Sequence, residues 1–334
     1  MHTLYQIADA EIRSCISDYL ILAADTNGFT AVASEFLDTE RKVAILLAGL
    51  NAPSGIVSAN KAVQEWERRR AVPFDVEAGI TAGVYTNIRQ AGIRYLNEVK
   101  AGTKNFTEWK PEFIRANPHT LPLLQRLAGF TSKAALKKRI GGVSDNTISL
   151  PAAKRLAEVL TACVIATDVR DAEILMGLEV TLEGIVRDLI GRVMLESIVE
   201  SALLKAGVPF KREAEYDRLS GVVYDFRADF IVPDEISPKA FIEVRKSSSR
   251  HASLYAKDKM FSAINWKGKH QAMLAVLIVD GEWTAETLRV MARVFDYVVP
   301  LQHVNSLSEA VSEYLDGDTT KLKWLIDFKI TPAN

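Results

Sequence analysis

The pattern of apolar and polar positions divides the chain into three regions. Residues 1–110 mix apolar and charged residues at helical spacing, for example over 7–24, and predict a helical scaffold that also carries dimer contacts. Residues 111–180 predict short helices separated by glycine and proline. Residues 181–334 begin with a long amphipathic stretch, 182–206, and continue with β-rich runs, which indicates α/β structure.

The third region predicts an alternation of helices and strands. In chain order we expect a helix at 182–206, strands at 222–232 and 240–245, a helix at 253–266, a strand at 272–279, a helix at 286–294, a strand at 297–300 and a helix at 307–315. The run 272–279 is apolar and rich in β-branched residues, which is typical of a strand buried on both faces.

Helix caps and breaks in the second region predict three short helices. The signals are a cap at Thr131 or Ser132, a turn at Gly141 and Gly142, a cap at Ser144 or Asp145, and a first-turn proline at Pro151. The first helix is expected over 133–139. Two short helices around a glycine turn resemble a helix-turn-helix, a motif that binds DNA.

Positive charge is concentrated in this same region. Its basic residues from 115 to 155 are Arg115, Arg126, Lys133, Lys137, Lys138, Arg139, Lys154 and Arg155, opposed by one acid, Asp145. This local excess predicts contact with DNA, although a solvated helical hairpin with ordinary lysines would give the same pattern. Within it we expect Lys137, Lys138 and Arg139 to contact phosphates. Ser144 and Asn146 are the candidates for base edges, because asparagine can pair bidentately with adenine.

Composition narrows the class of protein. The chain has 334 residues, is 48% hydrophobic and has a formal net charge of −1, so no global field favours a polyanion. Its longest apolar runs have eight residues, against about 20 for a membrane span, and we expect no signal peptide. The two cysteines, Cys15 and Cys163, lie far apart, as expected of free thiols in the cytoplasm.

Two acids interrupt otherwise apolar β-rich segments. Asp229 precedes an apolar run, and Glu243 lies between Phe241-Ile242 and Val244. Burying an isolated carboxylate is costly unless a cation or metal compensates it. Strand alternation puts Glu243 and Arg245 on one face and Lys246 on the other. A carboxylate and a cation on one face suit a hard divalent ion next to a phosphate.

These residues resemble a known nuclease signature. Asp229, thirteen intervening residues and then Glu243-Val244-Arg245 resemble the PD-(D/E)xK motif of a superfamily that includes most type II restriction endonucleases. The resemblance covers roughly 182–300. It implies a restriction-endonuclease-like α+β core and Mg²⁺ held by Asp229, Glu243 and the Val244 carbonyl. It further implies an acid on the leading helix, for which we prefer Glu196 over Glu200.

The sequence departs from this motif in two places. Residue 228 is alanine rather than proline, and Arg245 stands at the lysine position. Arginine stays charged and can bind phosphate, but it does not readily lose a proton. Either Arg245 acts as an electrostatic clamp alone, or a neighbour supplies the lysine. The neighbours that could do so are Lys257 and Lys259 on the following helix and Lys246 if the strand bulges, with His251 as a possible proton acceptor. We expect the catalytic residues to be Asp229, Glu243, Arg245 and Lys257.

The segment after the motif also carries positive charge. Residues 241–270 contain Arg245, Lys246, Arg250, Lys257, Lys259, Lys267 and Lys269 against Glu243 and Asp258, a local charge of +5. The turn at 246–249 offers hydroxyls and backbone amides, so we expect Lys246 and Ser248 to contact phosphates. An exposed basic loop without such a role is the alternative.

The resemblance and the charges together predict a type II restriction endonuclease. It would hydrolyse double-stranded DNA with Mg²⁺ at a short, palindromic site, leaving 5′-phosphates, and would act as a homodimer beside a cognate DNA methyltransferase as functional partner. One alternative is a DNA-binding regulator whose nuclease-like domain no longer cleaves, which Arg245 favours; another is a repair or resolvase-type nuclease. A metabolic α/β enzyme is disfavoured because the sequence has no glycine-rich phosphate loop.

Overall fold

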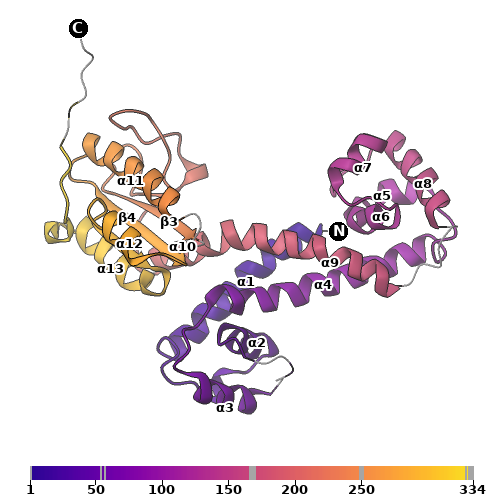
Figure 1. Cartoon of the computed structure of the whole chain (residues 1–334), viewed down its shortest axis with the longest axis horizontal. Helices are drawn as coiled ribbons and strands as arrows, with labels where there is room; N and C mark the ends of the chain where they lie inside the picture. The colour runs from indigo at the N-terminus through magenta and orange to yellow at the C-terminus, as the bar shows by residue number, and fades with distance from the viewer. Residues whose placement is uncertain are drawn as a thin grey trace, which may run out of the picture. The chain divides into compact units, whose positions relative to one another are not determined.

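The computed structural model describes residues 2–52, 55, 58–164, 171–247, 252–327 and 329. The chain divides into two compact units, Met1–Met194 and Leu195–Asn334. The regions 1–110 and 111–180 distinguished by sequence both fall within the first unit, and its boundary lies after residue 194 rather than 180. Figure 1 shows the elements of both units.

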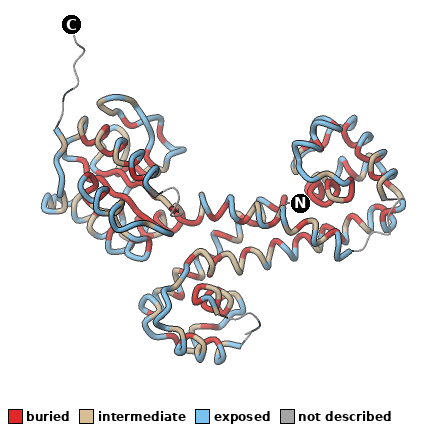
Figure 2. The backbone as a smooth tube through the Cα atoms, viewed as in Figure 1, coloured by how far each residue is buried: buried red, intermediate tan, exposed pale blue. Residues whose placement is uncertain are grey.

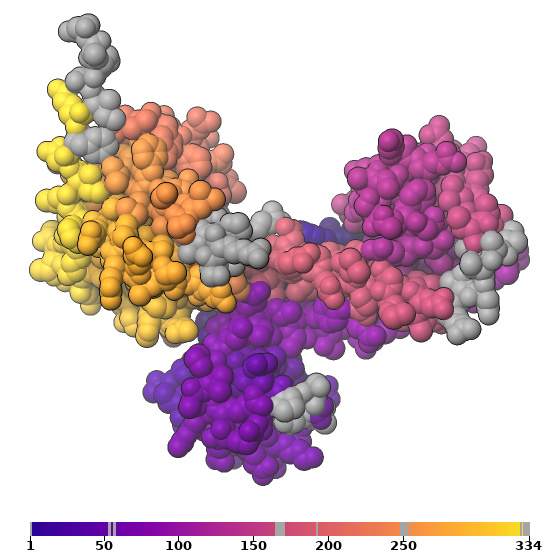
Figure 3. All heavy atoms as spheres, in the orientation of Figure 1, coloured from indigo at the N-terminus to yellow at the C-terminus, as the bar shows by residue number. Residues whose placement is uncertain are grey.

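The first unit is helical, as its sequence predicts. Its helices are α1 Leu4–Asp25, α2 Glu40–Gly49, α3 Ala59–Arg69, α4 Val76–Gly102, α5 Pro111–Ala116, α6 Leu121–Leu127, α7 Lys133–Ile140, α8 Leu150–Val164 and α9 Asp171–Leu189, with the short turns η1 Ser34–Phe36, η2 Pro118–Thr120 and η3 Ile190–Met194. The long α4 buries Ile80, Val84 and Ile88, one turn apart, and packs against α1, α2 and α9. Helices α5 to α8 gather in one lobe (Figure 3), in which α6 also packs against α9 and α4.

The prediction of a second short helix after a cap at Ser144 or Asp145 is wrong. Ser132 does cap α7, because its Oγ accepts the Ala135 N–H at 3.1 Å. Beyond α7, however, Val143 and Ile148 pair as an antiparallel bridge, and both side chains are buried. Two β-branched residues that bury across a polar turn favour a hairpin over a helix. We call residues 142–149 the α7–α8 hairpin.

The second unit contains a five-stranded mixed sheet, in agreement with the predicted α/β class. Its elements are α10 Leu195–Lys205, β1 Lys211–Arg212, η4 Glu213–Glu215, β2 Phe230–Val232, β3 Ala240–Ser247, α11 Ala252–Lys269, β4 Leu274–Gly281, α12 Ala285–Met291, β5 Tyr297–Pro300, η5 Leu301–His303, α13 Val304–Leu315 and η6 Thr319–Lys321. The sheet order is β1-β2-β3-β4-β5. The pairs β1–β2 and β2–β3 are antiparallel, and β3–β4 and β4–β5 are parallel.

The core of this unit lies on the face of the sheet that α11 covers. Phe241 of β3 and Leu277 of β4 pack there with Trp266 of α11 and Phe295, all fully buried. Both β3 and β4 are buried along most of their length, as Figure 2 shows in red. Such burial on both faces explains why their sequences read as near-continuous apolar runs.

Two predicted elements are shorter than expected. The helix expected at 182–206 is interrupted by the π-helical turn η3, so α10 starts only at Leu195. The strand expected at 222–232 forms only in its last three residues. The side chain of Asn265 bonds the backbone N–H groups of Val223 and Tyr224 and the Tyr224 carbonyl, and these bonds occupy groups that a strand would pair with a neighbour.

Candidate active site

The strand register places two acids side by side. Strands β2 and β3 pair Phe230 with Ile242 and Ile231 with Phe241. Continued by one residue, this register sets Asp229 opposite Glu243. Residues directly opposite in an antiparallel pair share a face, with Cβ atoms about 4.5–5.5 Å apart. The acids that sequence analysis selected from different segments therefore meet at the end of β2.

The Asp229 carboxylate is bonded to the residue that follows Glu243. Its Oδ2 accepts the backbone N–H of Val244 at 2.7 Å. In a strand, the N–H and carbonyl of one residue point toward the same neighbour. The Val244 carbonyl is thus directed toward the Asp229 side of β3. Asp229, Glu243 and Val244, the ligand set implied by the resemblance, lie in one place.

Glu243 is a buried carboxylate with two cations near one of its oxygens. It is 1% exposed, its Oε2 accepts from Lys259 Nζ at 2.7 Å, and Arg245 Nη2 lies 3.8 Å from the same oxygen. Its Oε1 has no hydrogen-bond partner among the described residues. Burial and the neighbouring Asp229 raise the pKa of Glu243 to about 8, against the opposing effect of Lys259. Asp229 itself is partly exposed.

The lysine bonded to Glu243 is Lys259 and not Lys257, which sequence analysis preferred. Lys259 is 4% exposed and bonded to Glu243, whereas Lys257 is exposed and makes no ion pair with either acid within the described residues. Helix geometry explains the difference, because positions two apart point about 200° apart around the axis. Sequence analysis had named both lysines as able to reach in.

Two further acids, Glu196 and Glu200, are bound by an arginine close to this site. Arg212 of β1 donates to Glu196 at 3.2 Å and to Glu200 at 3.2 Å, both on α10. The pKa of Glu196 is raised by burial and by Asp229, and Arg212 opposes this shift. Glu196 is therefore close enough to Asp229 for their charges to interact, but its carboxylate is bonded to Arg212. Sequence analysis did not single out Arg212, since only the pairing of β1 with β2 brings it here.

The oxygen donors fit a hydrated hard cation. Within the described residues no group of three or more His, Cys, Asp or Glu side chains is arranged to hold a metal ion. Mg²⁺ usually keeps several waters and binds proteins through one or two carboxylates plus substrate phosphate. Asp229, the unpartnered Oε1 of Glu243 and the Val244 carbonyl match that donor chemistry.

Two of the cations counted over 241–270 are buried in ion pairs and lie away from the surface. Lys259 and Lys267 are buried, and Lys267 is paired with Asp296 at 2.5 Å. The Lys246 ammonium lies 3.9 Å from the carboxylate of Asp280, the residue that pairs with it on β4. Ser248, His251 and Arg250 lie outside the described residues. The described part of this segment therefore exposes fewer cations than the sequence count suggests.

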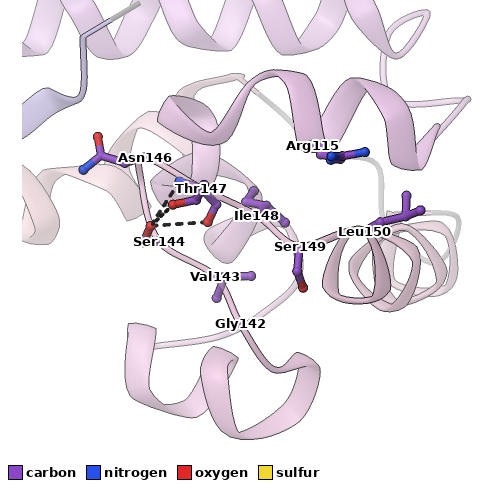
Figure 4. Close-up of a pocket in the computed structure, with 9 residues that line it drawn as sticks. All are labelled: Arg115, Gly142, Val143, Ser144, Asn146, Thr147, Ile148, Ser149 and Leu150. Carbon is purple, nitrogen blue, oxygen red and sulfur yellow. Dashed lines mark hydrogen bonds between the residues drawn. The ribbon is translucent and has the colours of Figure 1, made fainter.

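The residues expected to read DNA in the first unit lie together on one lobe. Lys137, Lys138 and Arg139 are exposed in the last turn of α7. Ser144 is occupied within the hairpin, since its Oγ accepts the Thr147 N–H at 3.0 Å. Asn146 is exposed at the hairpin tip and projects away from it (Figure 4).

Comparison with known proteins gives no relative: no family model, no curated protein and no solved structure matches this chain. None of the helices in the described residues is long and apolar enough to cross a membrane.

Proposed function

We propose that this protein is a Mg²⁺-dependent endonuclease that cleaves double-stranded DNA, as a type II restriction enzyme does. The observation that carries the proposal is the register that sets Asp229 opposite Glu243, with Val244 bonded to one acid and Lys259 to the other. An arrangement of two carboxylates, one backbone carbonyl and one lysine suits hydrolysis of a phosphodiester.

The order of elements supports the same proposal. A leading helix α10, an antiparallel β2–β3 pair that carries the acids, the helix α11 and the parallel strand β4 follow the order that the resemblance implies. Symmetric cutting at a palindromic site by a homodimer, 5′-phosphate products and a cognate methyltransferase are part of the proposal.

Each side chain has a distinct task. Mg²⁺ bound by Asp229, Glu243 and the Val244 carbonyl would supply a water of lowered pKa and a Lewis acid for phosphate oxygens. Lys259 holds Glu243 in place and balances its charge in the buried site. Arg245 is partly exposed and permanently charged, and it would contact a phosphate oxygen as negative charge develops there.

One observation favours the alternative of a DNA-binding regulator that does not cleave. Glu243 is 1% exposed, and burial together with Asp229 raises its pKa, which favours the protonated carboxyl over the carboxylate. A metal ligand must lose that proton. In a protein that binds DNA without cleaving it, these residues would serve only to stabilise the fold.

Plasmid cleavage separates the two functions. We expect the wild type to nick or linearise supercoiled DNA with Mg²⁺, and Asp229→Asn and Lys259→Ala to lower the rate by about 10²–10³-fold. Lys257→Ala, two positions away on the same helix and exposed, is the matched control and should cleave at the wild-type rate. Wild-type protein that binds the plasmid yet leaves it intact at every Mg²⁺ concentration would establish the regulator.

A further inference from the structure

The lobe formed by α5 to α8 contains a pocket of about 660 Å³. Arg115 of α5 borders it on one side and the α7–α8 hairpin on the other, with Leu150 of α8 at its end (Figure 4). The lining combines this guanidinium with apolar side chains and with the hydroxyls of Thr147 and Ser149. The backbone N–H groups of the hairpin residues Ser144, Thr147 and Ser149 are bonded within the hairpin itself. The guanidinium and the two hydroxyls can donate to the oxygens of an anion.

The only acid of the hairpin is neutralised. Asp145 accepts from Lys133 Nζ at 2.7 Å, which ties the hairpin to the first turn of α7. Arg115 is exposed and has no ion pair within the described residues. The pocket consequently presents a guanidinium that has no ion-pair partner among the described residues.

Further cations continue from the pocket over the neighbouring helices. The exposed ones without an acid partner among the described residues are Lys137, Lys138, Arg139, Lys154 and Arg155. Arg155 donates to the carbonyl of Ile140 at 3.3 Å, so α8 brings its guanidinium to the end of α7 that carries the first three. The exposed acids of α5 and α8, Glu112 and Glu158, are fewer than these cations.

We propose that this pocket seats a phosphate of a DNA backbone between Arg115 and the α7–α8 hairpin, with the cations of α7 and α8 on neighbouring phosphates. A free nucleotide offers the same phosphate chemistry. The DNA backbone is favoured because the cations extend well beyond what one bound phosphate group occupies. The inference rests on the proposed function for its choice of duplex DNA, and it places the contact in the first unit, apart from the cleavage site.

Binding of a labelled duplex tests the proposal. The full-length protein is titrated into a fluorescent, random-sequence duplex in EDTA, where no cleavage occurs, over a series of salt concentrations. We expect Arg115→Ala to weaken binding several-fold at low salt and to reduce the slope of log K against log salt by about 1. Arg115→Lys, which keeps the charge, should recover most of the lost affinity.

A neighbouring lysine supplies the matched control. Lys110 is exposed just before α5, and its ammonium lies 3.7 Å from Glu108. Lys110→Ala should change affinity by less than about twofold, because a surface charge that is already paired adds little. Equal salt slopes for wild type and Arg115→Ala, with both proteins folded by circular dichroism, would overturn the proposal.

Competition identifies the source of the phosphate. ATP and inorganic pyrophosphate should displace the duplex only at millimolar concentrations, as expected of weak general anions. Tight ATP binding that Arg115→Ala abolishes, with duplex binding unchanged, would assign the pocket to a nucleotide and contradict the inference. The cleavage proposal fails separately: Asp229→Asn should bind the duplex as well as the wild type while losing cleavage.

Discussion

Glu243 combines burial with a neighbouring carboxylate, and both oppose its ionisation. Its folded-state pKa of about 8 lies above the ordinary value of 4.5. Between these two values the folded state binds the proton more tightly than the unfolded state does. The stabilising contribution of the protonated group is therefore complete below about pH 4.5 and is lost as the pH rises to about 8.

Removing this ionisation should flatten the pH dependence of stability. In Glu243→Gln the amide stays neutral, so this loss of stability with rising pH is absent. The difference in free energy of unfolding, variant minus wild type, should therefore increase by roughly 1 kcal/mol per pH unit between about pH 5 and 8. Urea denaturation at several pH values, without metal, measures the difference. Parallel curves for the two proteins would show that Glu243 is not the group that titrates.

Asp296 is a second buried acid, and its role is structural. Its side chain and that of Lys267 are fully buried, and its Oδ2 also accepts the Ala275 N–H at 2.7 Å. Its Oδ1 accepts the N–H groups of Lys323 and Trp324, each at 2.7 Å. This carboxylate connects α11, β4 and the segment after η6.

Truncating Asp296 should leave a buried ammonium without a partner. We expect Asp296→Ala to lower the free energy of unfolding by about 3–5 kcal/mol. Lys269→Ala, at an exposed position of the same helix α11, should stay within about 0.5 kcal/mol of the wild type. Thermal and urea denaturation of the three proteins provide the comparison, and similar midpoints for all of them would contradict the assigned role.

Among the elements, the α7–α8 hairpin depends on a glycine with unusual backbone geometry. Gly141 has φ +96° and ψ −142°, a conformation that side chains with a Cβ rarely adopt. Gly142 has no such positive φ, and a Cβ there would meet only Ser149 Oγ at 3.7 Å.

The two glycines therefore form a matched pair for mutation. Gly141→Ala should destabilise the protein by about 1–3 kcal/mol through backbone strain. Gly142→Ala should change stability by no more than about 0.5 kcal/mol. Equal thermal midpoints for both variants would show that the turn tolerates a side chain at residue 141 and that its geometry is not constrained.

The elements best predicted from sequence are those that bury apolar runs. Strand β5 has the bounds expected of it, and β3 and β4 lie within two residues of theirs at each end. Their local pattern and their burial agree. The strand expected from residue 222 failed because Asn265, 42 residues from Val223, binds its backbone. A contact so distant in sequence leaves no local signal.

The candidate site divides along the same line. Asp229 and Glu243 were identifiable because acids in apolar strands are costly and conspicuous. Lys259 and Arg212 were not selected, since their relevance depends on how α11 and β1 pack against β3 and β2. Sequence analysis also counted Lys267 among the local positive charges, whereas the fold buries it against Asp296.

For the whole molecule, the two proposals assign different tasks to the two units. The sheet of the second unit would cleave DNA, and the α5–α8 lobe of the first would contact the DNA backbone. Symmetric cleavage predicts that the full chain is a dimer, with a sedimentation mass twice that of one chain. A monomer that remains monomeric on DNA would contradict symmetric cutting while leaving the metal site unaffected.

The metal site itself is tested most directly by locating a bound ion. Crystals grown with Mn²⁺, a stand-in for Mg²⁺ that scatters anomalously, should show one strong peak about 2.0–2.3 Å from carboxylate oxygens of Asp229 and Glu243 and from the Val244 carbonyl. The same crystals of Asp229→Asn should lose most of it. A peak elsewhere, or none beside these residues at saturating Mn²⁺, would contradict the proposed active site.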